Sequence, residues 1–170
     1  MDYIITTDRL NMRLMLESDQ AYLSKIFSDP VAMTYYPSTK TQEEVIRWIN
    51  WTLNNYRKFG VGLWIVEDKQ TGAFLGQCGI VPQKVDGQVQ MEIGYLFTRQ
   101  VWGKGYATEA ALGCKRYGFE QLNVPQLISL IDPDNHASIR VAEKIGMAQE
   151  KTISKWDKQL YLYKVVNQFT

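Results

Sequence analysis

Three strand-like stretches, near 61–69, 74–83 and 88–97, follow one another with only short turns between them. The turns contain Thr71-Gly72 and Asp86-Gly87, and an Asp-Gly pair is typical of a two-residue hairpin because such turns require positive φ angles. Strands joined this closely pair with neighbours that run in the opposite direction. The sequence therefore predicts an antiparallel meander in the middle of the chain.

Helix and strand signals lie on both sides of the meander. Before it, Leu10 to Leu14 alternate as in a half-buried strand, Ser18 is expected to cap a short helix, and Thr41 with Glu44 forms a capping box that begins a long amphipathic helix. After it, the patterns predict a helix at about 106–119, a strand near 126–131, a helix from an Asn135 cap to Gly146, and a closing hairpin over 147–166 that turns at Trp156-Asp157. We expect a mixed α/β (α+β) fold with a largely antiparallel sheet.

The composition favours one globular domain over residues 1–170. With 45% hydrophobic and 22% charged residues, a chain of 170 residues can bury one sizeable core. Its 19 basic and 18 acidic side chains give a net charge of +1, which argues against binding to nucleic acid or to a membrane surface. Cys78 and Cys114 lie in segments that resemble strand and helix interiors, and a single histidine leaves no zinc cluster. The pattern shows neither a signal sequence nor a membrane span, so we expect a cytoplasmic protein. Because there is no Cys/His cluster, we expect no bound metal.

A glycine-containing turn connects the last meander strand to the following helix. Gly103-Lys104-Gly105 precedes a helix that begins Tyr106-Ala107-Thr108, so several unpaired N–H groups lie at the positive end of that helix. Such an end binds phosphate, and glycine lets an anion approach the backbone closely. A turn that simply requires glycine fits this fragment equally well. Two other phosphate loops fit less well, because the dinucleotide fingerprint needs a third glycine and a P-loop needs Ser or Thr after Gly-Lys.

Several motifs along the chain resemble one enzyme family. Gln100-Val101-Trp102-Gly103-Lys104-Gly105 matches the pattern Gln/Arg-x-x-Gly-x-Gly/Ala of the GNAT superfamily of acetyl-CoA-dependent N-acetyltransferases. The run from Glu92 to Ala110, the run from Asn135 to Met147 and the opening Thr7-Asp8-Arg9-Leu10 resemble the branch of ribosomal-protein N-terminal acetyltransferases. The resemblance covers nearly the whole chain in the right order.

This resemblance implies a fold and a cofactor site. The fold would be a GNAT-like domain whose central sheet of about seven strands, flanked by about four helices, is splayed into a V that receives acetyl-CoA. The pyrophosphate would bind the N–H groups that follow Gln100, and Asn135 would face the pantetheine arm. The expected cofactor-binding residues are Leu96, Phe97, Thr98, Gln100, Val101, Trp102, Gly103, Lys104, Gly105, Tyr106, Ala107, Thr108, Asn135 and Ser138.

Acetyl transfer to an amine needs a base and a proton donor. A free amine is protonated at neutral pH, and Glu92, on the polar face of the last meander strand, is our candidate general base. A strand glutamate that faces solvent is the competing interpretation. Where many family members carry a tyrosine this chain has Ala142, so the resemblance points to Ser138 as the group that contacts the thiol. Ser138 could equally be an ordinary residue near the Asn135 cap.

The resemblance also implies where an acceptor would bind. The resemblance places an acceptor pocket near Tyr35 and Tyr36, and either Tyr161 or Tyr163 in the last strand could approach the site. Aromatic residues at such positions often belong to the core. We expect acetyl transfer to a primary amine, either a small molecule or a protein N-terminus, by direct attack in a monomer or homodimer. The alternative is a non-catalytic acyl-CoA sensor of the same fold. An RNA-binding module is a third interpretation, which the near-neutral charge disfavours.

Overall fold

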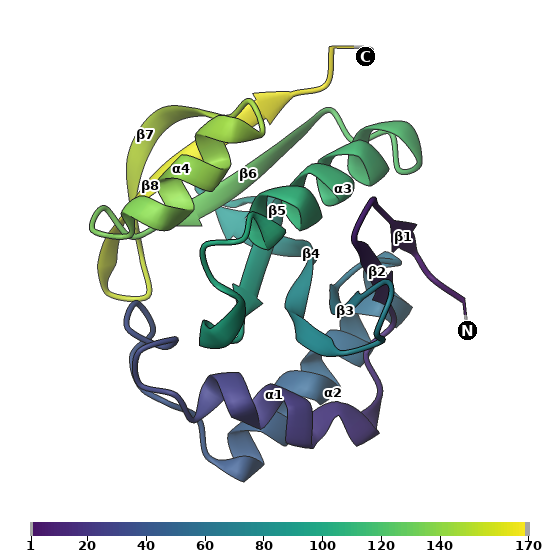
Figure 1. The fold of residues 1–170 in the computed structure, drawn as a ribbon. Coiled ribbons are helices and arrows are strands. Elements are labelled where there is room, and N and C mark those ends of the chain that lie inside the picture. Colours follow the sequence, from purple (N-terminus) through teal and green to yellow (C-terminus); the bar gives the residue numbers. More distant parts are fainter. Residues whose placement is uncertain (1, 169–170) are drawn as a thin grey trace.

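The predicted meander forms the centre of one twisted sheet in the computed structural model, which describes residues 2–168 (Figure 1). Within those residues the sheet has eight strands in the order β1-β2-β3-β4-β5-β6-β8-β7. The strands are β1 (Ile5–Thr6), β2 (Leu10–Arg13), β3 (Leu63–Asp68), β4 (Phe74–Val85), β5 (Gln88–Phe97), β6 (Gln126–Ile131), β7 (Ala148–Lys155) and β8 (Lys158–Val166). Asp86 and Gly87 have φ angles of 50° and 80° at the β4–β5 turn, so the predicted hairpin is confirmed.

All neighbouring strands are antiparallel except β5 and β6. The predicted mixed fold with a mainly antiparallel sheet is therefore confirmed. The strand count exceeds the expected seven because the two-residue β1, which the sequence pattern did not indicate, pairs with β2.

Four α-helices accompany the sheet within the described residues. They are α1 (Gln20–Phe27), α2 (Gln42–Phe59), α3 (Tyr106–Glu120) and α4 (His136–Lys144), and short 3₁₀ turns cover Glu17–Asp19 (η1) and Arg99–Val101 (η2). The capping box at α2 is confirmed, because the Thr41 hydroxyl accepts from the N–H of Glu44 and the Glu44 carboxylate accepts from the N–H of Thr41. Asn135 caps α4 by accepting from the N–H of Ser138.

The predicted Ser18 cap is wrong. The chain forms η1 at this point and α1 begins at Gln20, with no side-chain cap. The neighbouring Asp19 is almost fully buried and forms a two-pronged ion pair with Arg13, with N–O distances of 2.8 and 2.9 Å. Its carboxylate also accepts from the N–H of Leu16. The charge-assisted hydrogen bonds of this buried pair are not apparent from the local pattern around Ser18.

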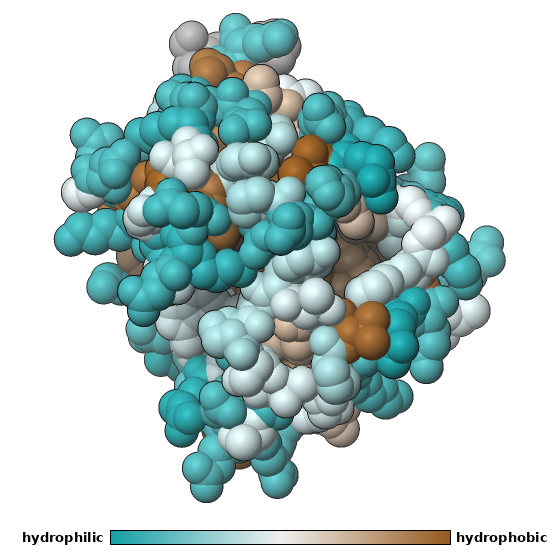
Figure 2. Space-filling view, turned by 90° about the vertical axis from the view of Figure 1, so that its left-hand side faces the viewer, coloured by the Kyte–Doolittle hydropathy of each residue, from teal (hydrophilic) through white to brown (hydrophobic). Residues whose placement is uncertain are grey.

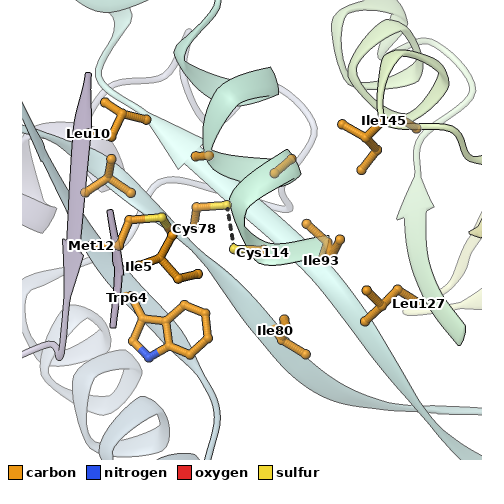
Figure 3. Packing of buried hydrophobic residues seen from close by; sticks show 14 of the residues in the cluster. Ile5, Leu10, Met12, Trp64, Cys78, Ile80, Ile93, Cys114, Leu127 and Ile145 are labelled. Carbon is orange, nitrogen blue, oxygen red and sulfur yellow. Dashed lines mark hydrogen bonds between the residues drawn. The ribbon is translucent and has the colours of Figure 1, made fainter. Parts of the chain in front are cut away.

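Side chains of β3 alternate between the two faces of the sheet. Trp64 and Val66 join the main core with α3, whereas Leu63 and Ile65 pack with residues of α1 and α2 on the other face. Figure 3 shows the main core, where Cys78 of β4 and Cys114 of α3 lie with their sulfur atoms 3.6 Å apart. Both cysteines are free and buried, as their positions in the sequence predict.

The surface seen in Figure 2 is mainly hydrophilic, and its hydrophobic residues form small separate patches. Among residues 2–168, none of the helices combines the length and apolar character that a membrane crossing requires.

Candidate functional site

The sheet separates where β5 and β6 run side by side. These two parallel strands share a single register pair, Glu92 with Ile128. Beyond this pair, toward the ends of both strands, side chains make the connections: the Ser129 hydroxyl donates to the carbonyl of Ile93 at 2.8 Å, and the N–H of Leu130 donates to the Glu92 carboxylate at 2.7 Å. If the two strands stayed paired, the Ile93 carbonyl and the Leu130 N–H would form hydrogen bonds between the backbones of β5 and β6. The two strands therefore diverge from Glu92 onward, and the splayed sheet implied by the resemblance is present.

Glu92 lies at the vertex of this splay and is only 9% exposed, so the solvent-facing interpretation is wrong. Its second carboxylate oxygen accepts from the side-chain amide of Gln83 at 3.0 Å. Burial raises the pKa of Glu92 to about 7, although the Leu130 N–H, the Gln83 amide and the charge of Lys155 favour the ionised form. A carboxylate with a pKa near neutrality is suited to accepting a proton at physiological pH.

Two tyrosines and Ser138 gather near Glu92. Tyr36 as a residue is 38% exposed, but burial of its hydroxyl raises the pKa of that group to about 12, and the negative charge of Glu92 adds to the increase. The Tyr95 hydroxyl donates to the carbonyl of Ser138 at 3.3 Å, and burial raises the pKa of Tyr95 well above its usual value. The charge of Glu92 also acts on the Tyr95 hydroxyl, so Tyr95 connects the predicted site residues Glu92 and Tyr36 with the backbone of Ser138. Tyr95 was missed, since its position in the strand pattern is that of an ordinary core residue.

The glycine turn has the geometry of an anion site. Gly103 and Gly105 have φ angles of 79° and 83°, a region that other residues rarely adopt. A Cβ added to Gly103 would meet no heavy atom within 4 Å, so the loop is open on that side. Within residues 2–168, no protein acceptor takes the N–H groups of Gly103, Lys104, Gly105 or Tyr106. These groups meet at the start of α3, where the helix dipole favours an anion.

Arg9 fixes this loop from outside. Its guanidinium donates to the carbonyl of Lys104 at 2.9 Å and to the carboxylate of Glu109 at 2.7 Å, and it lies 4.5 Å from the centre of the Tyr106 ring. The Thr7 hydroxyl donates to the same carboxylate. The sequence indicated Thr7 and Arg9 only through the family resemblance. Their role as a support depends on Glu109, a partner 100 positions away from Arg9.

Comparison with known proteins agrees with this geometry. Residues 9–148 match the family described as "Acetyltransferase (GNAT) domain".

The chain belongs to the GNAT acetyltransferase family.

It is 52% identical over 160 residues to the uncharacterized protein YkkB of Bacillus subtilis, an alignment that covers 94% of this chain and 93% of that protein. It is 35% identical over 167 residues to the uncharacterized N-acetyltransferase YnaD of the same species, and this alignment covers 92% of the present chain and 94% of YnaD. The crystal structure of an acetyltransferase from Agrobacterium tumefaciens superposes with a TM-score of 0.85 at 27% identity, over 97% of this chain and 94% of that one.

The remaining predicted residues of this GNAT protein fall into two groups. Leu96, Phe97 and Thr98 at the end of β5 are at least partly buried and anchor the loop, because the Thr98 N–H donates to the carbonyl of Leu75 and the Trp102 indole donates to that of Phe97. The exposed or partly exposed loop residues are Gln100, Val101, Trp102, Lys104, Tyr106, Ala107 and Thr108.

The predicted acceptor residues lie on different elements of the fold. Tyr161 packs at the margin of the main core, and within the described chain it makes no hydrogen bond to Glu92 or Ser138. Tyr35 and Tyr36 lie on the exposed segment between α1 and α2. Met33 and Trp48, which precede and follow them in the chain, pack into the core on the α1–α2 face.

Proposed function

We propose that this GNAT protein transfers an acetyl group from acetyl-CoA to a primary amine by direct attack, without a covalent enzyme intermediate. The observation that carries the proposal is the buried Glu92 carboxylate at the vertex of the splayed strands. It lies on the strand that leads into the glycine loop. The acceptor would be a small-molecule amine or a protein N-terminus.

The chain offers groups that fit the cofactor. The open, positive-φ loop at Gly103 and Gly105 presents free N–H groups to a pyrophosphate, and Lys104 adds a positive charge beside them. Asn135, the N-cap of α4, and Ser138, in the first turn of that helix, follow β6 on the other side of the splay and would face the pantetheine arm. When bound, acetyl-CoA would supply the activated thioester.

Two solved structures of this fold support a CoA ligand. The ribosomal L7/L12 alpha-N-protein acetyltransferase RimL and an aminoglycoside acetyltransferase were each solved with coenzyme A, and each superposes with a TM-score of 0.79. Their identities to this chain are only 13% and 18%, so they support the shape of the site and leave the acceptor open.

Glu92 would accept the proton of the attacking amine, directly or through a water. The Leu130 N–H and the Gln83 amide hold its two oxygens in place, and burial keeps its pKa near that of a useful base. The Ser138 hydroxyl would donate a hydrogen bond to the departing sulfur. Ala142, which is 2% exposed and packed in the main core, has no group that could do so.

Calorimetric titration with acetyl-CoA, CoA and ATP in parallel, followed by thiol release with a panel of amines, tests the proposal. Saturable binding of both CoA species without binding of ATP, followed by amine-dependent thiol release, is the expected result. Binding without turnover of any amine would favour the acyl-CoA sensor instead. Absence of CoA binding would contradict both functions. The cytoplasmic location, the single domain and the monomeric or homodimeric state stay predictions.

A further inference from the structure

Three contacts connect the segment after α1 to the far side of the splayed sheet. The Tyr35 hydroxyl donates to the carbonyl of Asp134 at 3.0 Å. The Lys158 ammonium lies 2.5 Å from a carboxylate oxygen of Asp132 and donates to the carbonyl of Tyr35 at 3.2 Å. We call Tyr35, Asp132, Asp134 and Lys158 the acceptor strap. In Figure 1 the loop between α1 and α2 meets the turn of the β7–β8 hairpin at this point, on the left.

The strap spans the opening of the V. Tyr35 follows Met33, which packs with residues of β3, β4 and α2, whereas Asp132 and Asp134 follow β6 and Lys158 begins β8. These are the two halves of the sheet that separate beyond Glu92. A connection between them therefore crosses the splay.

The same segment lies next to the proposed base and is fixed at both of its ends. Tyr36, directly after the strap residue Tyr35, is close enough to Glu92 for the carboxylate charge to raise the pKa of its buried hydroxyl. At the other end, Asp29 forms a two-pronged ion pair with Arg99 of η2, with N–O distances of 3.0 and 3.1 Å. The segment is thus attached to the cofactor loop at one end and to the β6–α4 connection at the other.

An extended peptide needs an open path of about 3.3 Å per residue leading away from the reacting amine. A peptide would have to pass the strap contacts that join the two halves of the sheet, whereas a small molecule needs no such path. We propose that the acceptor is a small-molecule amine that binds beneath the strap, and that a protein N-terminus is excluded. This inference rests on the proposed acetyl transfer.

Two conjugates of CoA test the inference without requiring turnover. In one conjugate, an acetyl group links the CoA sulfur to the nitrogen of propylamine. In the other, the same group links the CoA sulfur to the α-amine nitrogen of a tetrapeptide. Calorimetry on the full chain compares their dissociation constants with that of CoA. We expect the propylamine conjugate to bind at least as tightly as CoA. The peptide conjugate should bind at least about tenfold more weakly than the propylamine conjugate, since it must break several strap hydrogen bonds.

A double variant, Tyr35→Phe with Lys158→Met, removes the strap contacts while keeping the ring and the aliphatic stem. In this variant the dissociation constants of the two conjugates should differ by no more than about threefold. Lys151→Met is the matched control, because the Lys151 pair with Asp86 is exposed and lies near the β4–β5 turn, away from the strap. In the control variant the dissociation constants of the two conjugates should differ as much as in the unmodified protein.

The outcomes separate the two claims. Equal binding of the peptide and propylamine conjugates by the unmodified protein would overturn the inference and leave acetyl transfer intact. A difference that persists in the double variant would also overturn it, since other residues would then exclude the peptide. Loss of binding by CoA itself would instead overturn the proposed function on which the inference rests.

Discussion

Glu92 combines two properties that usually exclude each other. It is buried, which disfavours its charge, yet it accepts hydrogen bonds from the Leu130 N–H and the Gln83 amide, which favour that charge. The desolvation is the larger effect, so the pKa rises to about 7 and does not fall. The same contacts hold the carboxylate at the opening between β5 and β6.

Glu92→Gln should lower kcat/KM in a pH-dependent way. A raised pKa means that Glu92 is largely protonated below about pH 7 and cannot accept a proton there. The ratio of the unmodified to the variant kcat/KM should therefore rise about tenfold per pH unit up to about 7 and then level at roughly 10² or more. Taking the ratio at each pH removes the titration of the acceptor amine. A ratio independent of pH would exclude Glu92 as the base, and the dissociation constant of CoA should barely change.

Gly103→Val should weaken CoA binding at least about tenfold, because a side chain would then occupy the space through which the pyrophosphate reaches the loop N–H groups. Gly72→Val is the matched control. Both glycines have φ angles between 74° and 79° and open space around the Cβ position, so the backbone strain is similar. Calorimetry should show the loss only at position 103. Equal affinities in the two variants would contradict the loop assignment.

At the scale of elements, α3 is positioned by the start of the chain. Arg9, just before β2, contacts the loop carbonyl of Lys104, the Glu109 carboxylate in the first turn of α3 and the ring of Tyr106. These contacts fix the free N–H groups in position before any ligand binds. Loops held in the binding conformation avoid the entropy cost of ordering.

Arg9→Met should therefore raise the dissociation constant of CoA about three- to tenfold, while the unfolding free energy changes by no more than about 1 kcal/mol because the ion pair is partly exposed. Arg57→Met, at an exposed position of α2, is the control. Calorimetry and urea unfolding measure the two effects separately. A stability loss without any change in affinity would show that Arg9 is purely structural.

At the scale of the whole molecule, the sheet consists of two parts. β1 to β5 form one continuous antiparallel set and β6 to β8 the other, and one register pair between β5 and β6 joins them. The acceptor strap and the Ser129 hydroxyl add further links. A ligand that binds in the splay would contact both parts and so stabilise their association.

Acetyl-CoA should consequently raise the melting temperature. At a concentration of 100 times Kd the stabilisation is about 2.7 kcal/mol, or about 5–10 °C for a chain of this size. Thermal unfolding monitored by fluorescence should show this shift with acetyl-CoA and not with ATP. Because Gly103→Val should weaken binding at least about tenfold, it should reduce the stabilisation at the same ligand concentration to about 1.4 kcal/mol or less, which is about half of the original shift. An equal shift with ATP would mean that the loop recognises phosphate in general.

The sequence by itself determined what depends on neighbouring residues. The Asp86-Gly87 hairpin, the Thr41–Glu44 capping box, the Asn135 cap and the positive-φ glycines follow from local backbone preferences, and together with the motif spacing they identified the family and the loop.

Only the tertiary structure decided which distant groups meet. Strand alternation placed Glu92 on one face of β5, but whether that face was buried depended on β4, β6 and the segment at Tyr36. The Arg13–Asp19 pair, the Arg9–Glu109 pair and the contact of Tyr35 with Asp134 likewise join residues through space. The local sequence pattern determines the backbone conformation. The protonation state of a side chain such as Glu92, and the access of a ligand to it, depend on burial and on neighbouring charges, which arise only when the chain has folded.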